Sequence, residues 1–120
     1  MEEKFYYRKL QIYQKARVLV KEIYLLLKKY PKEENYALCD QIRRAIISVP
    51  SNIVEGISRT SDKEKLHFVT VAYASLMEVL CQMELSIDLG YIDNSEFEKI
   101  ESLIFEESIM INSFKNKLVK

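Results

Sequence analysis

The 120-residue sequence is poor in the residues that turns, phosphate-binding loops and disulfide scaffolds require. It contains 2 glycines, 2 prolines, 2 cysteines, 1 histidine and no tryptophan. β-Sandwiches and barrels place turn residues at intervals of roughly 8 to 12 positions, and phosphate-cradling folds need glycine-rich loops, so the sequence argues against both classes. The remaining composition, 48% hydrophobic and 30% charged residues, favours a single domain, residues 1–120, built of a few long helices.

The two cysteines, Cys39 and Cys81, have no C-x-x-C spacing, and two cysteines do not make a disulfide scaffold in a chain of this length. We therefore expect reduced, buried thiols. The N-terminal residues lack the apolar stretch of a secretory signal, and no segment approaches about 18 uninterrupted apolar residues. These absences predict a cytoplasmic protein with no membrane association.

Neither sign of charge is in excess, since 18 basic residues balance 18 acidic ones. The chain therefore has no global field that would attract DNA, RNA or an anionic membrane. The charges are nevertheless unevenly spread: residues 1–75 carry 14 basic and 9 acidic side chains, whereas residues 76–112 carry 1 basic and 9 acidic ones. Such polarity fits the orientation of one copy against another, a local polyanion site, or simply the solvated faces of helices.

Four segments carry apolar residues at spacings of three and four, the pattern of an amphipathic helix. We expect helices over about residues 8–30, 33–58, 61–89 and 94–118. Their apolar stripes are Ile12, Ala16, Leu19, Ile23, Leu26 and Tyr30; Leu38, Ile42, Ala45, Val49 and Ile53; Val69, Ala72, Leu76, Val79, Met83 and Ile87; and Phe97, Ile100, Ile104, Ile111, Phe114 and Leu118. Because the connections are short, the fold class predicted is all-α, an antiparallel up-down-up-down four-helix bundle.

Several residues mark the predicted helix ends. Pro31 ends the first helix, and Gly90 is suited to follow the third. Ser61 with Glu64, and Ser95 with Glu98, have the Ser-x-x-Glu spacing of a capping box at the start of the third and fourth helices.

Pro50 lies inside the second predicted helix, where it removes one N–H and clashes with the carbonyl of Ile46, at a cost of about 3 kcal/mol. The apolar stripe nevertheless continues in register from Val49 to Ile53. We therefore expect the second helix to be kinked at Pro50 rather than to end there.

Two helices carry apolar pairs on the side that faces away from their own stripe. These pairs, each seven residues apart, are Val18 with Leu25 and Ile47 with Val54. An isolated bundle would leave all four side chains in water, so they form a candidate oligomer interface.

A polar stripe follows one flank of the second predicted helix. Its members, at spacings of three and four, are Gln41, Arg44, Ser48, Asn52, Glu55 and Arg59. One interpretation is a hydrogen-bonded ladder that meets a neighbouring helix or subunit. The other is a docking site for an external ligand.

The sequence gives little support for a catalytic site or a metal site. Glu64 and His67 have the Glu-x-x-His spacing of di-iron bundles, but His67 is the only histidine and the capping box already employs Glu64. A cysteine nucleophile would need Cys39 or Cys81 beside His67, and no motif indicates this. We expect Glu78 to pair with Arg43 or Arg44. The sequence thus predicts no enzyme, no cofactor and no metal, and identifies no small-molecule substrate.

Basic side chains provide a weak case for nucleic-acid binding. Arg43, Arg59, Lys63 and Lys65 form the candidate patch, if they gather at one end of the bundle. No helix-turn-helix turn, zinc-finger spacing or RNP-like aromatic motif accompanies them. The favoured interpretation of these residues is that they are solvated basic side chains or form ion pairs between subunits.

The segments Gln41-Ile42-Arg43-Arg44-Ala45 and Ser48-Val49-Pro50-Ser51-Asn52-Ile53-Val54-Glu55-Gly56, followed by Arg59, closely resemble the signature of the 23S rRNA intervening-sequence protein family. The likeness extends to Tyr13-Gln14-Lys15-Ala16, Tyr30-Pro31 with Glu34, Ala72 through Glu78, and Leu89-Gly90-Tyr91-Ile92, and so covers nearly the whole chain. One departure is Ala74, where the family commonly has glycine.

The resemblance implies a bacterial four-helix bundle that assembles as a ring-like homopentamer and is similar in fold to the accessory protein of diversity-generating retroelements. It brings no catalytic residues. Its signature positions Arg44, Asn52, Glu55 and Arg59 coincide with the polar stripe. Two hypotheses follow: a non-enzymatic oligomeric scaffold or adaptor, and alternatively an RNA- or ribosome-associated binding protein that uses the local basic patch.

Overall fold

The computed structural model describes residues 4–119, which form four long α-helices and two short 3-10 helices. The α-helices are α1 (Gln11–Leu27), α2 (Leu38–Ser58), α3 (Asp62–Asp88) and α4 (Asn94–Leu118), and the 3-10 helices are η1 (Tyr6–Lys9) and η2 (Lys32–Glu34). No strand occurs between residues 4 and 119. The predicted all-α class with four helices is thus confirmed.

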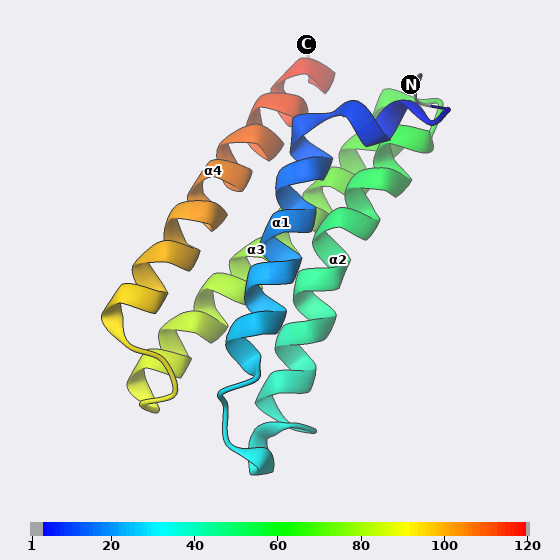
Figure 1. Cartoon of the computed structure of the whole chain (residues 1–120). Coiled ribbons are helices and arrows are strands. Elements are labelled where there is room, and N and C mark those ends of the chain that lie inside the picture. The colour runs from blue at the N-terminus through cyan, green and yellow to red at the C-terminus, as the bar shows by residue number, and fades with distance from the viewer. Residues whose placement is uncertain (1–3, 120) are drawn as a thin grey trace.

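The four helices pack side by side, and each contacts its two neighbours. The contacting pairs are α1 with α2, α2 with α3, α3 with α4, and α4 with α1, and the most extensive contact joins α2 to α3. Figure 1 shows the chain descending along α1 and α3 and ascending along α2 and α4, so that both termini lie at the same end. The face between α1 and α2 is therefore opposite the face between α3 and α4.

The predicted apolar stripes form the core. Buried members from the four helices include Leu19 and Ile23, Ile42 and Ile53, Leu76 and Met83, and Ile104 and Ile111. In the last turn of α1 the buried residue is Leu27, whereas Leu26, the predicted member of the stripe, is only partly buried against the core. Spacings of three and four placed the core correctly because burial of one stripe per helix is what stabilises a bundle.

The first two helices start later than predicted. Leu10 is extended and separates η1 from α1, which begins at Gln11 rather than near residue 8. Lys32–Glu34 form only the 3-10 helix η2, and the irregular backbone of Ala37 (φ −116°, ψ −103°) delays α2 to Leu38. Glu34 still favours the start of α2, because its side chain accepts a hydrogen bond from the Leu38 amide at 3.3 Å.

Side chains join the two connections at the lower end of the bundle in Figure 1. Tyr30 donates to Ser86 Oγ at 2.7 Å, and Tyr91 donates to Glu34 at 2.6 Å. This second bond is the main reason why the pKa of Tyr91 is raised to about 12. Burial raises the pKa of Tyr30 as well. Both phenols therefore serve as permanent hydrogen-bond donors that fasten the α1–α2 connection to the end of α3.

The predicted helix ends are confirmed in part. Ser61 Oγ accepts from the Glu64 amide at 3.1 Å, as predicted. The Glu64 carboxylate accepts from the Ser61 hydroxyl at 3.1 Å rather than from a backbone amide, so only half of the predicted capping box forms. Gly90 has φ +78°, and the Tyr91 amide reaches back to the Ser86 carbonyl at 2.9 Å, which completes a Schellman motif. α1 ends at Leu27, three residues before the predicted end at residue 30, so Pro31 follows the helix without being the residue that ends it.

The predicted Ser95–Glu98 box at the fourth helix was wrong. The box consists of Asp93 and Glu96, because the chain turns into the helix two residues earlier than the serine pattern indicated. The Glu96 amide donates to Asp93, and the Asp93 amide donates to Glu96.

α2 continues through Pro50, so the proline does not end the helix. Six residues later, Gly56 is buried where α2 and α3 approach each other closely. A Cβ atom at Gly56 would lie 3.0 Å from Val69 Cγ2 and 3.2 Å from the Lys65 carbonyl. The absence of a side chain at Gly56 is therefore what allows this close approach.

α3 is long and apolar enough to cross a membrane by length and composition, with a mean hydropathy of 1.3 over its most apolar window. Its Val69, Leu76 and Met83 side chains are nevertheless buried against the other helices. The apolar residues of α3 are thus mostly those of a helix that contributes to the core of a bundle. Some of them, such as Leu85, lie on the outer surface.

Candidate functional site

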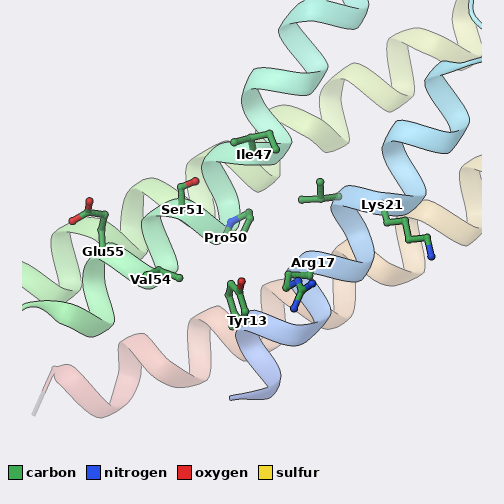
Figure 2. A pocket seen from close by; sticks show the side chains of 9 residues that line it. Tyr13, Arg17, Lys21, Ile47, Pro50, Ser51, Val54 and Glu55 are labelled. Carbon is green, nitrogen blue, oxygen red and sulfur yellow. The ribbon is translucent and has the colours of Figure 1, made fainter. Parts of the chain in front are cut away.

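A groove between α1 and α2, here called the α1/α2 groove, lies on the outer surface of the bundle. It has a volume of about 530 Å³ and is lined by Tyr13, Arg17, Val20, Lys21, Ile47, Pro50, Ser51, Val54 and Glu55. Figure 2 shows Pro50 and Val54 on α2 facing the space that Tyr13 and Arg17 border on α1. Ile47, Pro50 and Val54 follow one another at spacings of three and four, which places them in one row along α2.

The structure divides the four residues of the predicted interface. Ile47, 43% exposed, and Val54 line the α1/α2 groove. Val18 and Leu25 are half-exposed on α1 outside it, and Leu25 borders a smaller cavity of about 270 Å³ between α1 and α4. Pro50 lines the groove between Ile47 and Val54, although the sequence analysis considered it only as a cause of a helix bend.

Charge at the α1/α2 groove is predominantly basic. The Arg17 guanidinium lies 5.8 Å from the centre of the Tyr13 ring, and Lys21 lies one turn further along α1. The acidic member, Glu55, is paired with Arg59 at 3.2 Å. The groove thus presents apolar walls with two cations along the α1 edge.

The polar stripe of α2 makes internal hydrogen bonds over its central part. The Asn52 amide group donates to the carbonyl and to the hydroxyl of Ser48, both at 2.8 Å. The Ser48 hydroxyl lies 2.8 Å from that of Ser75 on α3. These contacts are those of the ladder interpretation, and they connect α2 to its neighbour within the same chain.

The two ends of the polar stripe are more exposed. Gln41 and Arg44 border a surface cavity of about 420 Å³ together with Ser48, Ser75 and Glu78. The predicted pairing of Glu78 with Arg43 or Arg44 was wrong: Arg44 pairs with Asp40 at 3.4 Å, and Arg43 lies 3.9 Å from the same carboxylate. Asp40 is one turn away on α2 itself and therefore nearer. Glu78 instead accepts from Gln82 at 3.3 Å.

The structure does not bring the candidate nucleic-acid patch together. Arg43 precedes Arg59 by sixteen residues on α2, which corresponds to about 24 Å along a helix, and it donates to the Asn35 carbonyl at 2.6 Å. Lys65 donates to the Ile57 carbonyl at 3.1 Å. Lys63 is exposed near the start of α3. The patch fails as a unit because Arg43 and Arg59 lie near opposite ends of one helix.

Arg59 is held at the turn between α2 and α3. Its guanidinium contacts Glu55 at 3.2 Å and Glu64 at 3.8 Å, and it lies over the Phe68 ring at 4.6 Å. These contacts fix the direction in which the chain leaves α2. Arg59, which was predicted to belong to both the polar stripe and the basic patch, therefore forms structural ion pairs at this turn.

The residues considered for catalysis are dispersed. Within residues 4–119, no group of three or more His, Cys, Asp or Glu side chains is placed to hold a metal ion. Cys39 is buried, and burial raises the pKa of its thiol, which disfavours the reactive thiolate. Cys81 is exposed, contrary to the predicted burial of both thiols.

Glu107 is an unusual residue that the sequence analysis missed. It is fully buried on α4 between Ile104 and Ile111, and neither carboxylate oxygen has a hydrogen-bond partner. Burial raises its pKa to about 8, although the charge of Lys15 acts in the opposite direction. The sequence spacing places Glu107 on the buried stripe, since it lies three residues after Ile104 and four before Ile111. The prediction was missed because several acidic residues occur nearby in α4 and most acidic residues lie on the surface.

A second apolar groove, here called the α3/α4 groove, was also missed. Its volume is about 530 Å³, and its lining residues are Tyr73, Met77, Leu80, Glu101, Ser102, Ile104, Phe105, Ser108, Ile109 and Asn112. Phe105 and Ile109 are 64% and 52% exposed, respectively. Apolar residues occur on several sides of α3 and α4, so sequence spacing does not distinguish outward positions from core positions there.

The fold and these surfaces define a small all-α four-helix protein whose prominent features are surface grooves rather than a constellation of reactive groups. The chain belongs to the 23S rRNA-intervening sequence protein family, whose model matches residues 8–113. The family resemblance drawn from the sequence is thereby confirmed.

Among solved structures, the chain is similar to a crystal structure, at 1.70 Å resolution, of a protein of unknown function from the S23 ribosomal protein family of Bacteroides thetaiotaomicron VPI-5482. The two chains superpose with a TM-score of 0.81 and 23% sequence identity, covering 88% of this chain and 95% of the other. This likeness shows a shared fold. A search among curated proteins finds no match. Neither the family description nor that structure names an enzymatic activity.

Proposed function

We propose that the protein is a non-enzymatic, homo-oligomeric scaffold or adaptor that self-associates through the α1/α2 groove. The observation that carries this proposal is an apolar groove of about 530 Å³ on the outside of the bundle, with Ile47 exposed at its edge. Apolar grooves rimmed by polar residues are typical of interaction sites, because burial of apolar surface contributes roughly 25 cal/mol per Å².

The internal contacts of the polar stripe support a structural role for its centre. Ser48, Asn52 and Ser75 satisfy one another, so they hold α2 against α3 and keep the groove-forming face of α2 turned outward. We propose that a bend of α2 at Pro50 shapes the groove, since Pro50 lines it and proline is the commonest cause of helix kinks. The antiparallel bundle thereby presents a preformed surface.

Assembly as a pentamer and residence in the cytoplasm are further parts of the proposal. The pentamer follows from the family resemblance. The cytoplasmic location is supported by the unpaired state of Cys39 and Cys81, which is typical of a reducing compartment.

RNA association ranks below self-association. Of the four candidate basic residues, Arg59 and Lys65 are engaged within the chain and Arg43 is remote from both. The family description is its main support.

The proposal is tested by light scattering on a sizing column, with absorbance recorded at 260 and 280 nm. We expect the unaltered chain to elute as an oligomer and Ile47→Asp and Val54→Asp to give smaller species, because each places a carboxylate in the apolar groove. Leu85→Asp is the matched control, since Leu85 is similarly exposed but lies outside both grooves. Circular dichroism checks that each variant keeps its helices.

An unchanged mass for both groove variants would show that the interface lies elsewhere. Excess absorbance at 260 nm across the oligomer peak, lost at high salt, would raise RNA association above the scaffold role.

A further inference from the structure

A cavity of about 320 Å³ lies beside the connection between α1 and α2, at the lower end of the bundle in Figure 1. Residues from the end of α1, from the connection and from the first turns of α2 line it, and it is here called the connection cavity. We propose that the connection cavity binds a nucleotide, with the phosphate held by three cations and the base placed against the Tyr24 ring. The cavity shares no lining residue with the α1/α2 groove, so the proposal does not depend on self-association.

The charge of the connection cavity differs from that of the other surface cavities described above. Lys28, Lys32 and Arg43 line it, and its described lining includes no carboxylate. The α1/α2 groove has a carboxylate beside its two cations, the cavity between α1 and α4 has two groups of each sign, and the cavity that Arg44 borders has one of each. Three cations without a carboxylate in the same cavity favour a phosphate ligand, because Arg and Lys form charge-assisted hydrogen bonds with phosphate oxygens.

The three cations are available to a ligand. Within residues 4–119, Lys28 and Lys32 are exposed and make no hydrogen bond or ion pair. Arg43 is held in place, because its Nη2 group donates to the Asn35 carbonyl at 2.6 Å and to Asn35 Oδ1 at 3.2 Å. The Nε and Nη1 groups of Arg43 have no partner among the described residues. The cavity therefore combines one oriented guanidinium with two long, adjustable ammonium groups.

The carboxylates nearest to these cations have other partners. Glu34 accepts a hydrogen bond from the Tyr91 hydroxyl at 2.6 Å. Asp40 pairs with Arg44 at 3.4 Å, which is shorter than the 3.9 Å that separates Asp40 from Arg43. The positive charge of the connection cavity is thus only partly neutralised by its surroundings.

An aromatic ring lies next to the cations. Tyr24 lines the cavity four residues before Lys28, which places both on one face of α1. Tyr24 is 39% exposed, and within residues 4–119 its ring contacts no other ring and no cation. Nucleobases stack on such rings whatever their identity. Leu27 and Pro31 add apolar lining, and the volume is within the range of small-molecule sites, roughly 300–1,000 Å³. A nucleotide would therefore use both the charged and the apolar lining, whereas a bare phosphate ion would use only the first.

Hydrogen bonds at this end of the bundle hold the cavity in shape. Tyr30, which lines it, donates to Ser86 on α3 at 2.7 Å. Tyr91 donates to Glu34, which lies in the α1–α2 connection. Because these bonds order the connection before any ligand arrives, little conformational entropy would be lost on binding.

Titration calorimetry of the full chain at low salt tests the proposal, with AMP, adenosine and inorganic phosphate as separate ligands. We expect AMP to bind more tightly than either of the others, because it alone carries both a base and a phosphate. Its affinity should fall as salt screens the cations. Equal affinity of AMP and adenosine would overturn the proposal, and so would the absence of binding by AMP at millimolar concentration.

Charge reversal locates the site. Lys28→Glu combined with Lys32→Glu should raise the dissociation constant of AMP about tenfold, since each substitution removes an exposed ionic contact and adds a repulsive one. The matched control is Lys63→Glu combined with Lys117→Glu, which changes the net charge equally at the opposite end of the bundle. An equal loss in the control would overturn the assignment to this cavity. Circular dichroism checks that both variants keep their helices.

Tyr24→Leu separates the base from the phosphate. We expect it to weaken AMP about fivefold or more, the effect of losing one stacked ring, and to leave the affinity for inorganic phosphate unchanged. An unchanged affinity for AMP would overturn the placement of the base. A short oligoadenylate distinguishes the source of the nucleotide: binding tighter than that of AMP, with the same dependence on Lys28 and Lys32, assigns it to an RNA strand, and binding no tighter assigns it to the free nucleotide.

Discussion

The first two helices and the last two present apolar grooves of the same volume, but their residues are arranged differently. In α1 and α2, one buried apolar stripe is clear, and outward apolar residues such as Ile47 and Val54 lie apart from it. In α3 and α4, apolar residues lie on the outer as well as the inner side of the helix, and Phe105 is exposed beside the buried Ile104. Surplus apolar residues are therefore recognised from the sequence where a helix has one clear apolar stripe, and are not recognised where apolar residues lie on several sides.

The two halves also differ in whether the polar side chains inside the bundle have hydrogen-bond partners. The central polar residues of α2 bond to one another and to α3, as Asn52 does with Ser48. Glu107 on α4 is buried without a hydrogen-bond partner for either oxygen. A satisfied polar group stabilises a specific helix pairing, while an unsatisfied one imposes a cost that depends on its ionisation.

The largest expected effect is a dependence of stability on pH that originates at Glu107. Burial holds the pKa of Glu107 at about 8 in the folded chain, above its value of about 4.3 in an unfolded chain. Between these values the folded state retains a proton that the unfolded state has lost. The free energy of unfolding should therefore fall as pH rises from about 4.5 to about 8, by on the order of 4 kcal/mol.

Urea unfolding at a series of pH values measures this dependence. Glu107→Gln should remove most of the decline, because the amide does not ionise. Glu106→Gln is the control, since Glu106 is exposed and pairs with Lys15 at 2.7 Å. A decline of equal size in Glu107→Gln and the unaltered chain would assign it to other groups.

Gly56→Ala should have the next largest effect and would test how closely the two halves are joined. The new Cβ would meet Val69 Cγ2 at 3.0 Å and the Lys65 carbonyl at 3.2 Å, so α2 and α3 must separate slightly. Overpacking of this kind costs about 1–3 kcal/mol, partly offset by the better helix propensity of alanine, about 1 kcal/mol. Thermal unfolding should show a lower Tm. A raised Tm would contradict this expectation, because it would show that the gain in helix propensity exceeds the free-energy cost of separating α2 from α3.

Asn52→Ala should have the smallest effect, a loss of about 1 kcal/mol, because it removes the donor that bonds to Ser48. Ser51→Ala is a suitable control at the adjacent exposed position. Urea unfolding of the two variants distinguishes a satisfied internal network from a docking surface. Equal stability of both variants would indicate that Asn52 is available for a ligand instead.

The fold was largely predictable from the sequence, whereas the surfaces were only partly so. Spacings of three and four identified the core because each helix buries one stripe, as Ile42 and Ile53 illustrate. The cap of α4 was displaced because both Asp93 and Ser95 precede a glutamate by three residues, and only the backbone decides between them.

Residues that depend on which helix is adjacent were not predictable. Glu78 was assigned an arginine partner, but Arg44 had a nearer carboxylate on its own helix. Arg43 and Arg59 share a charge and a helix, yet the length of α2 separates them. The α3/α4 groove was missed because its exposed residues look like core residues in the sequence.

The measurement that tests the central claim most directly is the mass of the unaltered chain and of Ile47→Asp, by light scattering on a sizing column at matched concentration. Self-association through the α1/α2 groove predicts a mass several times the 14.2 kDa of one chain, near five chains if the family resemblance holds for assembly, and a smaller mass for the variant. A mass near 14.2 kDa for the unaltered chain at every concentration would contradict the account.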